Sequence, residues 1–331
     1  MINAIKKLTI CMAAAGFVAL QTMSSTGMTA QQAEKMYRIG YLRSGNPGTF
    51  STKAFVRELR KLGYEEGRNI TIDSRFAKRR KKLLPGMAAE LVRQNPDVMV
   101  VCCGPAISAA QKATSTIPIV VAIGANYVEK GLVKSLRRPG GNLTGLSSIS
   151  HNVVGKQLQL FKETVPGMSR VAVLYQKSRY AHLKLKETQE AAKTLGLELV
   201  PVDVGSPDDF PGAFRQIEGA RVDALFVQRS GLIHGHKHLT TKFARKAGLP
   251  TMYGHRQEAE AGGLMAYGTD VTALFRRTAH YVDKIFKGAN PAEMPIELPT
   301  KFDFVVNLKT AKALGITIPS SILLQATKVI E

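Results

Sequence analysis

The sequence has no tryptophan and three cysteines among 331 residues. Two of the cysteines, Cys102 and Cys103, are adjacent, so a bond between them would close a strained ring, and they offer no disulfide framework. A chain built this way must be held together by a hydrophobic core, which excludes the small disulfide-stabilised secreted scaffolds. Its length suits two domains rather than one.

Long apolar runs are also missing. The most apolar stretch, residues 8–20, is shorter than the roughly 20 residues that a membrane-spanning helix needs. It follows Lys6 and Lys7 and precedes a polar, small-residue stretch that ends at Ala30. This order is that of a secretory signal peptide. We therefore expect residues 1–30 to be a signal peptide, cleaved near Ala30, and the mature protein to be exported.

Acidic side chains are scarce: 25 aspartates and glutamates face 46 lysines and arginines, for a formal net charge of +21. The densest basic run is residues 78–82. Such a surplus suits an anionic ligand, an anionic membrane surface or nucleic acid, whereas a short run in a polar linker favours a solvated face that only sets solubility. We expect no nucleic-acid partner, because the chain shows no helix-turn-helix, zinc finger or basic strand interleaved with aromatic residues.

From Tyr37 onward, apolar strands alternate with helices, a pattern that predicts parallel βαβ units. Within residues 51–62, Phe55, Leu59 and Leu62 have a helical spacing, and residues 97–103 form a continuous apolar run, typical of a strand in a sheet buried on both faces. The pattern restarts after residues 138–142. Residues 38–42 match residues 170–174 at an offset of 132, and Ile117-Pro118 matches Leu249-Pro250 at the same offset. The sequence therefore predicts an α/β fold of two similar, Rossmann-like, doubly wound lobes.

The tail does not begin a third lobe. It predicts a helix at residues 271–287, an extended segment at 294–301, a strand at 302–306 and two last helices at 308–314 and 320–329. A helix and a strand after the second lobe suggest that the chain crosses back between the lobes. We expect lobe 1 to comprise residues 31–148 plus about 269–300, and lobe 2 to comprise 149–268 plus about 301–331. The crossing segments would form a hinge, and a cleft between such lobes suits a small ligand.

The stretch from Leu249 to Asp270 is the first candidate for a ligand-facing segment. It predicts a strand at 249–253, a polar turn at 254–257 and, after Gly262-Gly263, a second strand at 264–267. Glycine beside aromatic and cationic side chains at the carboxyl end of a strand is typical of ligand crevices in open α/β sheets.

Several blocks in the same order are typical of one bacterial family: residues 38–42, 62–70, 113–119, 131–133, 138–145 (Arg-Pro-Gly-Gly-Asn-Leu-Thr-Gly), 260–265, 299–302 and 307–315. Through them the chain resembles the periplasmic substrate-binding proteins of ABC transporters, in the group that includes tryptophan- and tyrosine-type binders. The resemblance implies a type I periplasmic-binding fold without catalysis or cofactor. It also implies a monomer in the periplasm that captures a small solute by hinge closure and delivers it to an ABC permease in the inner membrane. The solute would be amino acid-like, an organic acid or an aromatic carboxylate.

The resemblance also implies where ligand contacts lie, namely on loops at the carboxyl ends of strands. The free N–H groups of the helix that begins at Gly104 would suit a carboxylate. The candidates are Ser44, Asn46, Gly104, Pro105, Ala106, Asn126, Ser147, Ser148, Ser178, Gln228, Tyr253, Arg256 and Tyr267.

Two departures from the family pattern bear on specificity. Asn126 stands where many relatives carry an aspartate that would suit a ligand amine. Residues 176–179 and 228–230 add cations where relatives are mostly neutral. We therefore hypothesise an anionic or neutral solute rather than a plain amino acid.

Three alternatives use other features. A sensing module for a membrane receptor would use the same cleft, and the sequence does not separate it from an importer. The alternating His234, His236 and His238 resemble a metal site, but Lys237 between them favours a solvated loop and no metal. Cys103 before a helix would suit a hydrolase nucleophile, but its apolar strand favours a buried structural cysteine.

Overall fold

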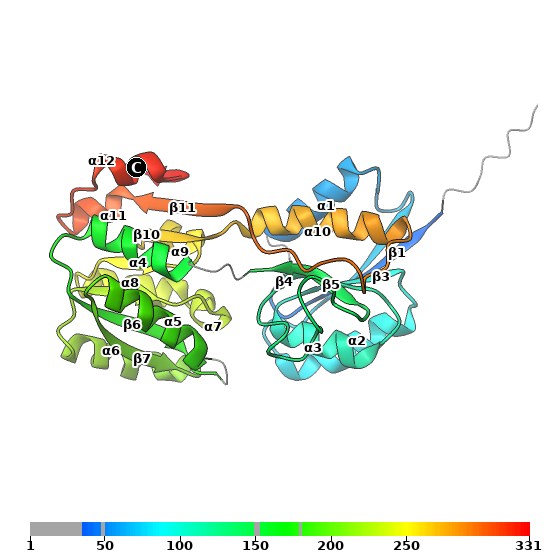
Figure 1. The fold of residues 1–331 in the computed structure, drawn as a ribbon, viewed down its shortest axis with the longest axis horizontal. Helices are drawn as coiled ribbons and strands as arrows, with labels where there is room; N and C mark the ends of the chain where they lie inside the picture. Colours follow the sequence, from blue (N-terminus) through cyan, green and yellow to red (C-terminus); the bar gives the residue numbers. More distant parts are fainter. Residues whose placement is uncertain (1–34, 48–49, 149–152, 179–180) are drawn as a thin grey trace, which may run out of the picture. The chain divides into compact units, whose positions relative to one another are not determined.

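The computed structural model describes residues 35–47, 50–148, 153–178 and 181–331. The expected signal peptide at residues 1–30 lies outside these ranges. From Tyr37 to Glu331 the chain forms one compact unit that contains two β-sheets, each covered by helices (Figure 1).

The first sheet has five parallel strands in the order β2-β1-β3-β4-β5. The strand β3 is buried at every position, as expected for a sheet with helices on both faces. The strands are β1 (Tyr37–Arg43), β2 (Ile70–Phe76), β3 (Val98–Cys102), β4 (Ile119–Gly124) and β5 (Leu143–Ser147), and the helices between them are α1 (Phe50–Lys61), α2 (Leu84–Arg93) and α3 (Gly104–Ala113).

The second sheet has seven strands in the order β12-β11-β10-β9-β8-β6-β7, in which β10 and β11 run antiparallel and the other neighbours run parallel. Its strands are β6 (Arg170–Gln176), β7 (Glu198–Val204), β8 (Ala224–Val227), β9 (Thr251–Tyr253), β10 (Met265–Thr269), β11 (Phe302–Asn307) and β12 (Lys328–Ile330). Its helices are α4 (Val153–Thr164), α5 (Ala181–Thr194), α6 (Phe210–Gly219), α7 (Gly231–Gly235), α8 (Lys237–Lys246), α9 (Arg256–Glu260), α11 (Leu308–Ala313) and α12 (Ser320–Gln325).

The two sheets repeat one topology. The order β2-β1-β3-β4-β5 of the first sheet recurs as β7-β6-β8-β9-β10 in the second. The shared strand order confirms the predicted α/β fold of two doubly wound halves. It also explains the offset of 132 residues, since β1 and β6 occupy equivalent central positions.

Helix α10 (Val271–Phe286) packs against α1 and β4 of the first sheet, although it follows β10 of the second (Figure 1). The ring of Phe286 stacks on Tyr37 with 4.0 Å between centroids. Tyr64 donates a hydrogen bond of 2.9 Å to Asp283. The chain then returns to the second sheet through β11 and β12, so segments between β5 and α4, β10 and α10, and α10 and β11 connect the sheets.

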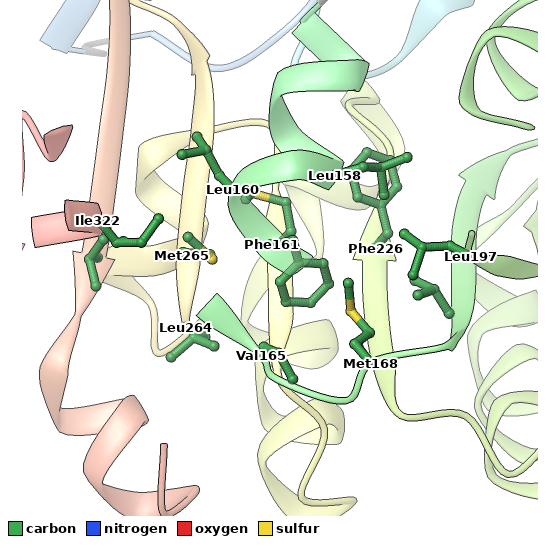
Figure 2. Close-up of a cluster of buried hydrophobic side chains, with 14 of the residues drawn as sticks. Leu158, Leu160, Phe161, Val165, Met168, Leu197, Phe226, Leu264, Met265 and Ile322 are labelled. Carbon is green, nitrogen blue, oxygen red and sulfur yellow. The ribbon is translucent and has the colours of Figure 1, made fainter. Parts of the chain in front are cut away.

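The core of the second sheet illustrates how helical spacing produces packing. Leu158 and Phe161 of α4 are three residues apart and therefore share one face of the helix. Both are fully buried and lie against the sheet, beside Phe226 of β8 and Met265 of β10 (Figure 2). This apolar layer fixes α4, the first helix after the crossing from β5.

Three local predictions were wrong. The predicted turn at 254–257 ends earlier, because helix α9 begins at Arg256. His234 lies in helix α7 rather than in a solvated loop, because the Ser230 hydroxyl caps that helix by accepting from the Ile233 N–H at 3.0 Å. The predicted last helix, residues 320–329, ends at Gln325, because residues 328–330 pair in parallel with β11.

Candidate functional site

Ionisable side chains gather where strands β8 and β9 end. We call this group the strand-end cluster, and its members come from α5, α7, α9 and the loops after β8 and β9. They are Lys184, Arg229, His234, His255 and Glu258.

Arg229 is the centre of the cluster. Its Nε donates to Nε2 of His255 at 3.1 Å, and its Nη1 donates to the carbonyl oxygen of Ser148 at 3.2 Å. The same carbonyl accepts from the Thr269 hydroxyl at 3.2 Å. Because Ser148 directly follows β5 of the first sheet, Arg229 ties the second sheet to a crossing segment.

A glycine makes room for Arg229. A Cβ atom on Gly254 would lie 2.9 Å from Cβ of Arg229, and one on Gly268 would lie 2.2 Å from the carbonyl oxygen of Gly254. Such distances are not reached by ordinary side chains, so both positions require glycine for close backbone approach. Gly254 therefore makes room for Arg229, and Gly268 makes room for the backbone of Gly254.

His255 is a neutral hydrogen-bond acceptor. Burial holds the pKa of its imidazole well below the ordinary value of 6.5, and the positive charge of Arg229 lowers the pKa further. A neutral ring can accept the Arg229 N–H through Nε2, whereas a protonated ring could not.

Glu258 organises the same region from a buried position, with 2% of its surface exposed. One carboxylate oxygen accepts from the His255 backbone N–H at 3.1 Å, and the other lies 3.4 Å from Nδ1 of His234. The carboxylate thus contacts the imidazole of His234 and the backbone of His255, and the two imidazole centroids are 4.5 Å apart.

Lys184 adds a further cation to the cluster. Its ammonium donates to the carbonyl oxygen of Arg229 at 3.4 Å. Burial lowers the pKa of Lys184, and the nearby charges of Arg229 and Lys130 lower it further. The positive charges around Lys184 create a potential that favours an anion.

The two cysteines lie at the end of β3. Their sulfur atoms are 3.0 Å apart, with Cys102 buried and Cys103 half-buried. The hydrogen bond from Cys102, together with Arg43 and Arg229, lowers the pKa of the Cys103 thiol, whereas its interaction with Cys103 and burial raise the pKa of Cys102. The predicted burial therefore holds for Cys102 but not fully for Cys103.

The predicted anion site at the start of α3 is smaller than expected. Pro105 has no N–H group, and the N–H of Ala106 donates to the carbonyl oxygen of Cys103 at 3.0 Å. The expectation of several free donors was wrong for these two residues, which leaves Gly104 as the remaining candidate donor there.

The other candidates of the first sheet lie where expected, at strand ends. Ser44 is half-buried after β1 and Asn46 is exposed beyond it. Asn126 follows β4 with a φ of 53°. Ser147 is buried, and its N–H donates to the carbonyl oxygen of Glu297 at 2.8 Å. The Ser148 hydroxyl donates to the carbonyl oxygen of Gly124 at 3.1 Å.

Candidates in the second sheet have mainly internal contacts. Gln228 donates from its amide to the Thr188 hydroxyl at 2.9 Å, and Ser178 is exposed. Tyr253 is fully buried, and a Cβ on Gly263 would lie 2.4 Å from its ring, so Tyr253 packs as a core residue. Arg256 lies near Glu260 and Asp303 at 3.6 and 4.0 Å, and Tyr267 stacks on Phe302. Ligand contact by these residues stays a prediction.

The structure brings Ser148 together with Arg229 and His255, and it adds Lys184, which the sequence reasoning did not select. Arg229 directly follows the candidate Gln228, so it could have been selected as a site residue from its position at a strand end. Lys184 lies on α5, where nothing local distinguishes it from other helix lysines.

Two hollows lie outside the strand-end cluster. One of about 640 Å³ is lined by residues of α10 and of the segment 297–301, and one of about 360 Å³ lies beside Tyr64 and Glu65. Neither is lined by any of the predicted site residues. In the described ranges no group of three or more histidine, cysteine, aspartate or glutamate side chains could hold a metal ion. Across that same part of the chain, no helix has the length and apolar character needed to cross a membrane.

Comparison with known proteins identifies the relatives of this chain. The sequence profile of the ABC transporter substrate-binding proteins matches residues 48–330. A tyrosine-binding protein of Clostridioides difficile is 27% identical over 263 residues, which cover 79% of this chain and 75% of that protein.

Solved structures similar to this chain point to the same group of proteins. A Streptococcus ABC domain in complex with L-Trp has a TM-score of 0.81 and 26% identity, and a conserved domain protein from Vibrio cholerae has 0.82 and 28%. Both matches cover 89% of this chain and 100% of the other. The fold is that of the type I periplasmic-binding proteins, as predicted.

Proposed function

The chain belongs to the family of ABC transporter substrate-binding proteins, and we propose that it binds a small carboxylate-bearing, amino-acid-like solute and delivers it to a membrane permease. Members of this family are solute-binding proteins, not enzymes. The tyrosine-binding relative and the structure with L-Trp support a solute of this class.

The observation that carries the proposal is the guanidinium of Arg229. Arg229 is half-buried at a strand end, and its guanidinium donates to a neutral imidazole and to a backbone carbonyl. Within the described residues, no carboxylate lies at ion-pair distance from it. A half-buried cation next to Lys184 gains most from an anionic partner, and a planar guanidinium matches a carboxylate in two hydrogen bonds.

We further propose that the solute lies between two lobes, with lobe 1 at residues 31–148 plus about 269–300 and lobe 2 at 149–268 plus about 301–331. The segments that connect the two sheets would act as the hinge. Contact between Arg229 and Ser148 supports this, because it couples the strand-end cluster to a connecting segment.

Export follows from the same proposal. A substrate-binding protein must meet its solute outside the inner membrane, and the charged, then apolar, then small-residue order of residues 1–30 suits a signal peptide. We propose that the mature protein acts in the periplasm.

Isothermal titration of the purified protein tests the solute class. The series contains L-tyrosine, L-tryptophan, phenylpyruvate, which lacks the amine, and tyramine, which lacks the carboxylate. At least one carboxylate-bearing compound should bind, and tyramine should not. Binding of tyramine as tight as that of L-tyrosine would contradict a role for the carboxylate. If phenylpyruvate binds and both amino acids fail, the anionic-solute hypothesis replaces the amino-acid one.

The variant Arg229→Gln tests whether Arg229 binds the solute. A lost charge-assisted hydrogen bond costs about 1.5–3 kcal/mol, so the dissociation constant should rise roughly 10- to 100-fold. Arg245→Gln removes the same charge from an exposed position of α8 and is the matched control. Equal effects of the two variants would show that only the net charge matters.

A further inference from the structure

Cys102 and Cys103 have contacts that a pair of structural cysteines does not need. Their sulfur atoms are 3.0 Å apart, about 1 Å more than a disulfide bond of about 2.05 Å. The contact lies at the junction of β3 and α3, where Cys103 has a φ of 77°. A positive φ in a residue other than glycine is costly and is concentrated at functional sites.

The two thiols differ in access and in charge. Cys102 is fully buried in the core of the first sheet, whereas Cys103 is half-buried. Arg43 and Arg229 favour the thiolate of Cys103, and the buried Cys102 keeps its proton. A half-buried thiolate beside a fully buried thiol is the arrangement of an attacking and a resolving cysteine.

We propose that Cys102 and Cys103 form a reversible dithiol–disulfide couple that exchanges with low-molecular-weight disulfides, with Cys103 as the attacking and Cys102 as the resolving cysteine. The thiolate of Cys103 attacks one sulfur of the external disulfide and forms a mixed disulfide, and the first external thiol leaves with the electron pair of the broken bond. Cys102 then gives up its proton, attacks the sulfur of Cys103 and releases the second external thiol. The protein pair loses two electrons and two protons, which the two external thiols gain.

Reversibility follows from the chain geometry. Adjacent Cα atoms are about 3.8 Å apart, closer than the 4.4–6.8 Å usual across a disulfide. The oxidised ring is therefore strained, and strained disulfides are easily reduced. Ring closure would also alter the peptide between β3 and α3, so the first turn of α3 should respond to oxidation.

The test uses the full chain, reduced first and then incubated with oxidised glutathione, acid-quenched, alkylated and digested with trypsin. One tryptic peptide, residues 94–112, contains both cysteines and excludes Cys11. In the wild type this peptide should lose two hydrogen atoms and retain no glutathione, and dithiothreitol should restore its mass. Cys102→Ser should retain glutathione on Cys103, and Cys103→Ser should react at least about tenfold more slowly.

Two results would overturn the proposal. Wild-type peptide that keeps glutathione would show that Cys102 does not resolve the mixed disulfide, and peptide that stays reduced would show that Cys103 does not attack. If either serine variant fails to fold, as checked by circular dichroism, the mass of the wild-type peptide still decides. None of these measurements depends on the solute, so the proposed transport function stands or falls separately.

Discussion

At the scale of single residues, burial and the neighbouring cations set the protonation of His255. Its imidazole accepts a hydrogen bond from Arg229 in the neutral form, and its pKa lies well below 6.5. In the unfolded chain the same ring binds a proton as the pH falls through about 6.5. The folded state binds fewer protons in this range, so it must lose stability there.

The free energy of unfolding should therefore decrease as the pH falls below about 6.5. A ring that stays neutral in the folded state loses about 1 kcal/mol of stabilisation by pH 5.5. Urea unfolding of the wild type and of His255→Gln, at pH 7.5 and 5.5, measures this. The amide oxygen of the variant can still accept from Arg229, so the variant should lose about 1 kcal/mol less over that interval. Equal losses in both proteins would assign the pH dependence to other groups.

The thiol of Cys103 is a second residue whose protonation depends on its surroundings. Cys102, Arg43 and Arg229 lower its pKa, so the thiolate should persist below the pH at which an ordinary thiol, with a pKa of about 8.5, is protonated. The rate of iodoacetamide alkylation at Cys103 should therefore reach half of its maximum below pH 8.5. Peptide mass spectrometry across pH 5.5–10 in Cys102→Ala and wild type gives the two midpoints. Because the hydrogen bond from Cys102 is the largest cause of the shift and alanine has no donor, the midpoint should rise in Cys102→Ala.

At the scale of helices and strands, buried apolar faces account for most of the architecture. Phe161 of α4 is fully buried in the core of the second sheet (Figure 2). Replacement by alanine should lower the free energy of unfolding by about 3–5 kcal/mol through lost burial and a cavity. Leu324→Ala, at a side chain that is 87% exposed, should change it by less than about 0.5 kcal/mol. Denaturant titration of both variants compares them, and a loss below 1 kcal/mol for Phe161→Ala would show that α4 is not a core helix.

Elements with a strong apolar period were predictable from the sequence. The spacing of Phe55 and Leu59 predicted α1, and the continuous apolar run of β3 predicted a strand buried on both faces. The failures were short elements without such a period. Helix α7 depends on one capping contact from Ser230, and β12 is a strand because it pairs with β11, more than twenty residues earlier.

The site was less predictable than the fold for a related physical reason. A strand end can be recognised from the sequence, so the positions of Ser148 and of the loop that holds Arg229 could be predicted. The direction of a side chain could not be predicted, since Tyr253 points into the core and Arg256 pairs with acidic neighbours. The partners in the cluster come from distant positions, with Arg229 and Ser148 separated by 81 residues. Such pairings depend on the tertiary fold.

At the scale of the whole molecule, the proposed function requires that solute binding change the relation between the two lobes. A solute held by groups of both lobes favours a closed arrangement by its differential affinity for it. Small-angle X-ray scattering should therefore show a smaller radius of gyration when a solute identified by titration is added in excess. The same solute should raise the melting temperature, by a free energy of about 2.7 kcal/mol at a hundredfold excess over the dissociation constant.

The variants used for titration separate closure from binding. At a solute concentration that saturates the wild type but lies below the dissociation constant of Arg229→Gln, this variant should keep the radius of the solute-free protein. Arg245→Gln should contract like the wild type, because its charge lies on an exposed turn of α8. Saturation of the wild type with an unchanged radius would contradict hinge closure while leaving solute binding intact. The protein would then bind its solute on one lobe, and the contact of Arg229 with Ser148 would serve only to anchor the connecting segment.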